Sequence, residues 1–196
     1  VQLNDTHPAI AVAELMRILM DDQGLSWVKA FEVTTATISY TNHTLLPEAL
    51  ESWPVHLMER LLPRHMQIIF TINASVIADA HAKSMVDFGF LGNISLIDEH
   101  NGRRVRMGQL AFVGAHSVNG VSELHSNLMQ QTVFRDLNKL YPGRINNKTN
   151  GVTPRRWLQQ CNPRLTALIT EAIGPGFLDN TEELSALEKF SDDSAF

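Results

Sequence analysis

The chain of 196 residues has 44% hydrophobic and 19% charged residues and a formal net charge of −5 at pH 7, a composition typical of a globular protein with one core or parts of two. The acidic balance argues against nucleic-acid binding, because phosphate contacts need clustered lysine and arginine. The single cysteine, Cys161, excludes an internal disulfide and fits a reducing cytosol, and no stretch approaches the ~20 apolar residues of a membrane span.

The first quarter of the chain begins with an apolar run and continues with helical patterns. Residues 1–5, VQLND, predict a short strand running into a turn. Because this start has no initiating methionine and no polar lead-in, we expect the chain to be a piece of a longer protein. A helix is then expected up to Gly24, and Ser26 is expected to cap a second element over 27–40. That element begins like a helix, but its Val/Thr/Ile-rich end fits a strand equally well.

The middle of the chain contains the longest predicted helix. A loop with a helical turn is expected around Pro47 and Pro54, and the apolar spacing over 64–83 predicts the long helix. On either side of 100–102, the runs ISLID and RRVRMGQLAFV predict two strands joined by a tight turn. One more helix is predicted from 121 to 140.

The last third of the chain is divided by turn residues. The stretch NNKTNG, 146–151, predicts a connector, and Pro154 and Pro163 each occupy the first position of an expected helix. Gly174 ends the second of these helices, and the acidic tail, 179–196, is expected to be helical or loose. Helices alternate with short strands and no repeat is present, so the fold class predicted is α/β.

Four polar stretches interrupt the apolar pattern, and each follows a strand-like run or opens a helix. They are NDTHP (4–8), TNHT (41–44), GAHSVNG (114–120) and NKTNG (147–151). Loops at strand ends are where α/β folds place their ligands. Asparagine amides, histidine rings and threonine hydroxyls complement a sugar, whose hydroxyls both donate and accept hydrogen bonds and carry no charge. The competing interpretation is structural, since His and Asn at strand ends also cap helices and satisfy buried carbonyls.

Standard catalytic and nucleotide-binding motifs are absent from the sequence. A zinc site drawn from His7, His43 and His116 has no acidic partner and no i,i+4 pairing to support it. Cys161 has no neighbouring histidine and lies on an expected helix, so the sequence does not support a nucleophilic role for it.

Several long motifs identify a resemblance to a known family. The segments QLNDTHPAIAVAELMRIL, YTNHTLLPEALESWPVHLMERLLPRHMQII, GAHSVNGVSELHS and NKTNGVTPRRWLQQCNPRL closely resemble the α-glucan phosphorylases of glycogen, starch and maltodextrin. The match runs in order from residue 1 to about Gly174 and is weaker over 79–105 and in the acidic tail.

The resemblance implies a glycosyltransferase with two Rossmann-like domains (a glycosyltransferase B-type fold), of which 1–148 would end the N-terminal domain and 149–196 would begin the C-terminal domain. Such enzymes are cytoplasmic and commonly dimeric. They use inorganic phosphate to cleave non-reducing-end α-1,4-glucosyl units from a glucan, and they release α-glucose 1-phosphate with retention. Their cofactor is pyridoxal 5'-phosphate, whose phosphate group assists proton transfer.

The resemblance also implies which residues contact the sugar. His43 takes the place of the histidine that binds the 6-hydroxyl of the transferred glucosyl unit, and Asn150 contacts the same unit. Asn119 and Val121 line the same pocket. The loops around them add further candidates, namely Asn4, Asp5, His7 and Thr44.

Other residues are given no catalytic part by the resemblance. Glu48 and Glu51 suggest a paired-carboxylate glycosidase, but they lie three residues apart on one helical turn and the match assigns them no role. The family's cofactor lysine lies in a glycine-rich stretch ending Asn-Met-Lys, and no lysine of this chain has that context. We therefore expect this chain to bind no cofactor and to be inactive alone. The alternative hypothesis is a free-standing carbohydrate-binding or interaction module derived from a phosphorylase.

Overall fold

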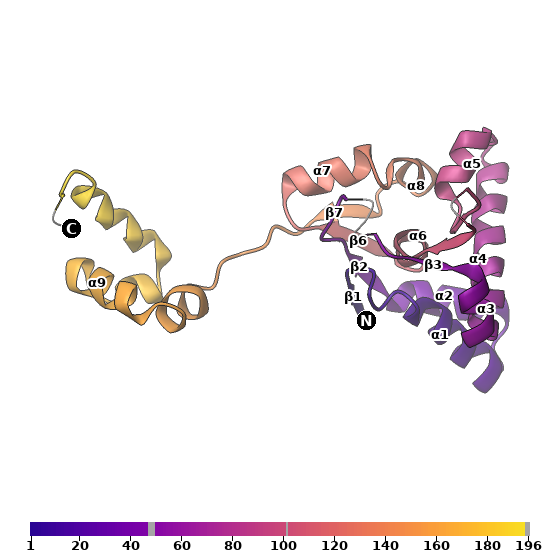
Figure 1. The fold of residues 1–196 in the computed structure, drawn as a ribbon, viewed down its shortest axis with the longest axis horizontal. Coiled ribbons are helices and arrows are strands. Elements are labelled where there is room, and N and C mark those ends of the chain that lie inside the picture. The colour runs from indigo at the N-terminus through magenta and orange to yellow at the C-terminus, as the bar shows by residue number, and fades with distance from the viewer. Residues whose placement is uncertain (47–49, 101, 195–196) are drawn as a thin grey trace. The chain divides into compact units, whose positions relative to one another are not determined.

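The computed structural model describes residues 1–46, 50–100 and 102–194, and it divides the chain into two units, Val1–Thr149 and Asn150–Phe196 (Figure 1). Each unit is described by itself. Among the described residues, every helix is too short or too polar to cross a membrane.

The first unit is built on a four-stranded parallel sheet in the order β1–β2–β6–β7. These strands are β1 (Gln2–Asn4), β2 (Ser39–Thr41), β6 (Ser117–Gly120) and β7 (Ile145–Asn147). Parallel neighbours need long crossover connections, which helices provide in this unit. Leu3, Tyr40 and Val118 are fully buried at the centres of their strands, so the middle of the sheet belongs to the core.

The crossover from β1 to β2 consists of three helical segments: α1 (Ala11–Arg17), the π-helical turn η1 (Ile18–Asp22) and α2 (Trp27–Thr37). Ser26 caps α2 by accepting a hydrogen bond from the backbone N–H of Lys29 at 3.4 Å, which confirms the predicted cap. The sequence predicts that residues 27–40 begin as a helix and end as either helix or strand. The structure has a helix followed by a strand, because α2 ends at Thr37 and β2 begins at Ser39.

The longest helix is α4 (Pro63–Ala82), as the sequence predicts, and it packs against α1 and α3 (Val55–Leu61). A shorter helix, α5 (Phe88–Ile94), follows it. The sequence predicts a loop at Pro54, and this prediction is wrong. Pro54 is the last residue of the strand β3 (Ser52–Pro54), and α3 begins directly after it. The other proline of that prediction, Pro47, lies outside the described residues.

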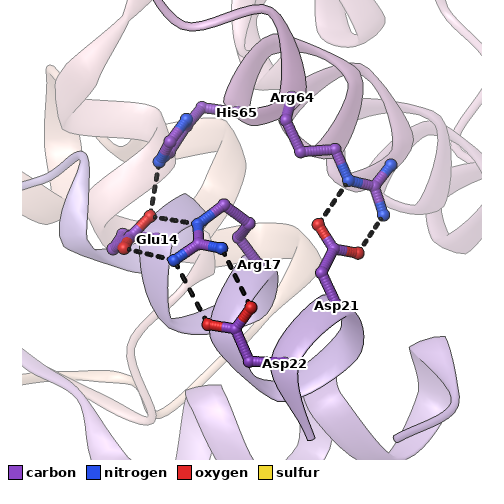
Figure 2. A network of polar contacts seen from close by, with 6 residues as sticks. All are labelled: Glu14, Arg17, Asp21, Asp22, Arg64 and His65. Carbon is purple, nitrogen blue, oxygen red and sulfur yellow. Dashed lines mark hydrogen bonds and ion pairs between the residues drawn. The ribbon is translucent and has the colours of Figure 1, made fainter. Parts of the chain in front are cut away.

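A network of charged side chains connects α1 and η1 with α4 (Figure 2). The carboxylate of Glu14 accepts hydrogen bonds from Arg17 and from His65, and the guanidinium of Arg64 donates two to Asp21. Donation from Arg17 and then from His65 lowers the pKa of Glu14 to about 2. The network therefore adds a polar connection to the apolar contact between the two helices.

A second, antiparallel sheet has the order β3–β5–β4, with β4 at Ile97–Asp98 and β5 at Arg104–Arg106. The two strands predicted on either side of 100–102 are present but shorter than predicted: the first is confirmed only at Ile97–Asp98, because Ile94 ends α5, and the second ends at Arg106, not at residue 113. Residues Met107–Val113 form the helix α6, in which all residues except Gln109 are buried. A short helix that is buried on nearly every side has apolar residues on most of its faces, as a buried strand does, so periodicity does not separate the two.

The single helix predicted over 121–140 is also wrong, because the structure has α7 (Glu123–Gln131) and α8 (Arg135–Leu140). The chain leaves helical geometry at Thr132, where φ is −121° and ψ is −99°. This break brings Phe134 into the core, where its ring packs edge-on against Tyr40 and tilted against Phe112. Packing of one large aromatic side chain accompanies the interruption of the helix.

Up to residue 194, the second unit has four helical segments: a π-helical turn η3 (Arg155–Gln160), α9 (Pro163–Ile173), and 3₁₀ segments η4 (Gly176–Leu178) and η5 (Thr181–Phe190). The side chain of Asn162 caps α9 by accepting from the N–H of Leu165, and Gly174 ends it with φ of 86°. Pro163 at the start of α9 and Gly174 at its end match the sequence prediction. The left-handed φ explains the glycine, because a side chain there would be strained.

Candidate functional site

The four polar stretches meet the parallel sheet at its strand ends. NDTHP begins at the last residue of β1, TNHT at the last residue of β2, and NKTNG at the last residue of β7, while the Asn119–Gly120 end of GAHSVNG closes β6. Because all four strands are parallel, their carboxyl ends lie on one edge of the sheet. This carboxyl edge is the candidate site.

His43 and Asn4 connect the ends of the first two strands. Nε2 of His43 lies 2.6 Å from Oδ1 of Asn4, and the His43 side chain is exposed. An amide oxygen only accepts hydrogen bonds, so Nε2 carries the proton and donates it. Nδ1 then bears a lone pair and has no partner among the described residues, so His43 can accept a hydrogen bond from a ligand hydroxyl.

Asn119 is held by its neighbours on both sides of its amide. Oδ1 accepts from the hydroxyl of Thr41 at 2.7 Å, and Nδ2 donates to the carbonyl of Gly120 at 2.9 Å. Gln2 in turn donates to the Thr41 hydroxyl at 2.7 Å. In this arrangement Asn119 organises the carboxyl edge across β2 and β6, and its remaining acceptor capacity is what a ligand could use.

Asn42 is a buried polar residue at the centre of this site, and the sequence analysis did not predict it. Its side chain is fully buried, and its Oδ1 accepts from Nε2 of His125 at 3.0 Å and from the N–H of Thr44 at 3.2 Å. Its Nδ2 donates to the hydroxyl of Tyr40 at 3.0 Å, and burial raises the pKa of that phenol. The signal in the sequence was the position of Asn42 next to His43 and of His125 in the SELHS segment.

Gly120 lets the start of α7 approach the end of β6. A Cβ atom on Gly120 would overlap the hydroxyl of Ser126 and lie 2.7 Å from the His125 ring. Val121, a predicted pocket residue, follows directly and is half-buried. The close approach places His125 where it reaches Asn42.

The loop after β1 brings a carboxylate to His7. Asp5 has φ of 64°, and its carboxylate accepts from the N–H of Thr6 at 2.7 Å. Oε2 of Glu51 accepts from the Thr6 hydroxyl at 2.7 Å and lies 3.2 Å from Nδ1 of His7. Donation by Thr6 and then by His7 lowers the pKa of Glu51 against the opposing effect of burial. The other glutamate of the predicted pair, Glu48, lies outside the described residues.

The zinc site considered from sequence does not form, because His116 precedes β6 whereas His7 and His43 follow β1 and β2. His116 is thus at the opposite edge of the sheet, where its Nδ1 lies 3.0 Å from the carbonyl of Thr35. Within 1–46, 50–100 and 102–194, no three His, Cys, Asp or Glu side chains are grouped as a metal site. Asn150 and the exposed Cys161 belong to the second unit.

Comparisons with known proteins agree on one family. The family model for carbohydrate phosphorylase matches residues 1–196. The human muscle form of glycogen phosphorylase is 50% identical over 196 residues, and the bovine muscle and liver forms are 49% and 50% identical. Each alignment covers 100% of this chain and 23% of the relative, so the chain spans about a quarter of the length of the curated relatives it matches.

Proposed function

Because the chain belongs to the carbohydrate phosphorylase family, we propose that it supplies part of the glucosyl-binding site of an α-glucan phosphorylase. The whole enzyme would use inorganic phosphate to remove α-1,4-glucosyl units from the non-reducing end of a glucan, giving α-glucose 1-phosphate with retention. The proposal extends to a cytoplasmic homodimer with a glycosyltransferase B-type fold, in which 1–148 ends the N-terminal domain and 149–196 begins the C-terminal domain.

The convergence of the polar stretches on one sheet edge is the observation that carries this proposal. The edge offers amides, hydroxyls and imidazole nitrogens, which suit a neutral polyhydroxylated ligand. His43 would accept a hydrogen bond from the 6-hydroxyl through Nδ1, since its Nε2 donates to Asn4. Further residues would line the pocket, and these are Asp5, His7, Thr44, Asn119, Val121 and Asn150.

Pyridoxal 5'-phosphate would be the cofactor of the whole enzyme, and the described residues of this chain do not fit it. A Schiff base needs a lysine amine in a shaped pocket with a partner for the cofactor phosphate. The ammonium groups of Lys83, Lys139 and Lys148 already donate to Leu140, Asp136 and Asn146. Lys29 pairs with Glu32 on an exposed helix face, and Lys189 is exposed with its ammonium over the ring of Phe190. The cofactor lysine would therefore come from another part of the enzyme.

Phosphorolysis of maltoheptaose tests the proposal. We expect the whole protein with its cofactor to release glucose 1-phosphate, and the 196-residue chain with added pyridoxal 5'-phosphate to release none. A pocket without its cofactor and opposite wall does not stabilise the charge that develops in the transition state. Product from the isolated chain, or none from the whole protein, would contradict the proposal.

A further inference from the structure

The loop that carries His7 is fixed by contacts on both of its sides. The N–H of Asp5 donates to the carbonyl of Thr41 at 2.9 Å, and the backbone of Asp5 is in the left-handed region with φ of 64°. Thr6, the next residue, is fully buried. A residue other than glycine in that region persists only where its surroundings determine it, so His7 leaves the sheet edge from a defined position.

Glu51 contacts this loop through a single oxygen. Its Oε2 accepts a hydrogen bond from the hydroxyl of Thr6 at 2.7 Å and lies 3.2 Å from Nδ1 of His7. Glu51 also lines a hollow of about 330 Å³, together with Arg104 and Arg106. Donation by Thr6 and then by His7 favours the ionised carboxylate, which can only accept hydrogen bonds.

A hydrogen-bond acceptor next to Nδ1 of His7 determines whether the other ring nitrogen, Nε2, donates or accepts a hydrogen bond. In a neutral imidazole with its proton on Nδ1, Nε2 bears the lone pair and accepts hydrogen bonds. The His7 side chain is 72% exposed, and its Nε2 has no partner among the described residues. Nε2 is therefore the ring atom that a ligand at the sheet edge can reach.

We propose that Glu51 is a positioning residue that holds His7 in the tautomer protonated at Nδ1, so that Nε2 accepts a hydrogen bond from a hydroxyl of the bound sugar. The inference rests on the proposed function and adds a residue to it. His43 and His7 then work alike: each donates from one ring nitrogen to an acceptor of this chain, Asn4 Oδ1 or Glu51 Oε2, and offers the other nitrogen as an acceptor.

A purely structural role for Glu51 is the competing interpretation, since its contact with Thr6 alone would tie the loop to the segment before β3. The two roles differ in whether the effect of losing Glu51 depends on His7. A double-mutant cycle measures that dependence, because residues that act through one another give non-additive effects.

The experiment uses the whole protein with its cofactor and measures KM for glucose 1-phosphate, kcat and the melting temperature. Glu51→Met keeps most of the side-chain volume and removes the acceptor, while Glu51→Gln keeps an amide oxygen that can accept from Nδ1. Both are made with His7 present and in a His7→Ala background. Thr6→Val is the matched control, because it removes the other hydrogen bond to the same carboxylate oxygen.

We expect Glu51→Met to raise KM about fivefold where His7 is present and less than twofold in the His7→Ala background, within the range of coupling between contacting residues. Glu51→Gln should restore KM to within about twofold of wild type. Thr6→Val should lower the melting temperature and leave KM unchanged. An equal rise in KM in both backgrounds, or a rise for Thr6→Val as large as for Glu51→Met, would overturn the positioning role. An inactive wild-type protein would instead overturn the proposed function, and this inference with it.

Discussion

His125 and Asn42 join the first turn of α7 to the end of β2, with Nε2 of His125 lying 3.0 Å from Oδ1 of Asn42. Asn42 is fully buried, and every polar atom of its side chain has a partner. A satisfied buried amide of this kind fixes the backbone on either side of it. Asn42 lies between Thr41 and His43, and each of these two residues forms a hydrogen bond with the end of another strand. The buried contacts of Asn42 therefore stabilise the centre of the carboxyl edge.

Removing His125 should therefore destabilise the protein. His125→Leu leaves Oδ1 of Asn42 with only the Thr44 N–H as a partner, and we expect a loss of about 1–3 kcal/mol in the free energy of unfolding. Urea denaturation measures it. His56→Leu is the control, because His56 is exposed on α3 and its replacement should change stability by less than about 0.5 kcal/mol. Equal effects of the two variants would contradict the role given to His125.

Under the proposed function, His43→Ala should weaken sugar binding with little effect on folding. The side chain is exposed, and a neutral hydrogen bond to a sugar hydroxyl contributes about 0.5–1.5 kcal/mol, so we expect KM for glucose 1-phosphate to rise about three- to tenfold in the whole protein. His116→Ala provides the comparison, since His116 lies at the other edge of the sheet. A similar rise for both substitutions would place the site elsewhere.

Gly120→Ala should be strongly destabilising for its size. The added Cβ would overlap the Ser126 hydroxyl and crowd the His125 ring, and overpacking of this kind costs about 1–3 kcal/mol. Gly92→Ala within α5 meets nothing within 4 Å, and alanine favours a helix by about 0.5–1 kcal/mol, so that variant should be slightly stabilised. Thermal unfolding tests this: relative to wild type, the melting temperature should fall for Gly120→Ala and rise slightly for Gly92→Ala. A melting temperature of Gly120→Ala equal to or above that of wild type would contradict the packing described at Gly120.

Asp136 should give the protein a component of stability that acid removes. The carboxylate is nearly fully buried, and burial alone would raise its pKa, but donation from Arg135, Asn93 and Lys139 lowers the pKa to about 2. Because the folded pKa lies below the ordinary value of 3.8, the stabilisation is complete above about pH 4 and is lost as the pH falls toward 2.

The test compares Asp136→Asn with wild type in urea at pH 6 and at pH 3. The variant should be less stable at pH 6, and the difference should shrink at pH 3. Glu32→Gln serves as the control, because Glu32 forms an exposed pair with Lys29 and should change stability little at either pH. A difference for Asp136→Asn that stays the same at both pH values would refute the ionic origin of the effect.

The sequence predicted the carboxyl edge of the parallel sheet better than the helices around the sheet. Polar residues that end an apolar run are a local signal, so the strand ends at Asn4 and Thr41 were readable without knowledge of the packing. The helix α6 was not predictable in this way, since the burial of all its residues but Gln109 depends on elements distant in sequence. The break before Phe134 likewise follows from the core position of one aromatic ring. Asn42 was missed because a buried amide and an exposed one look alike in sequence.

The contacts of Glu51 could not be predicted from the sequence for a related reason. Thr6 and Glu51 are separated by 45 residues, and their hydrogen bond depends on where the segment before β3 crosses the loop after β1. Spacing along the chain relates Glu51 only to its neighbours, which suggested a carboxylate pair with Glu48. The partner that the structure gives it is a histidine of the candidate site.

The order of strands in the parallel sheet also determines when the carboxyl edge can exist during synthesis. β6 lies between β2 and β7, and β7 ends at Asn147. During synthesis β1 and β2 therefore emerge first, β6 follows once Gly120 has been added, and the edge lacks β7 until Asn147 has left the ribosome. Since such long-range pairing is slow to form, a nascent chain stopped before β7 would have every histidine discussed above but an incomplete carboxyl edge.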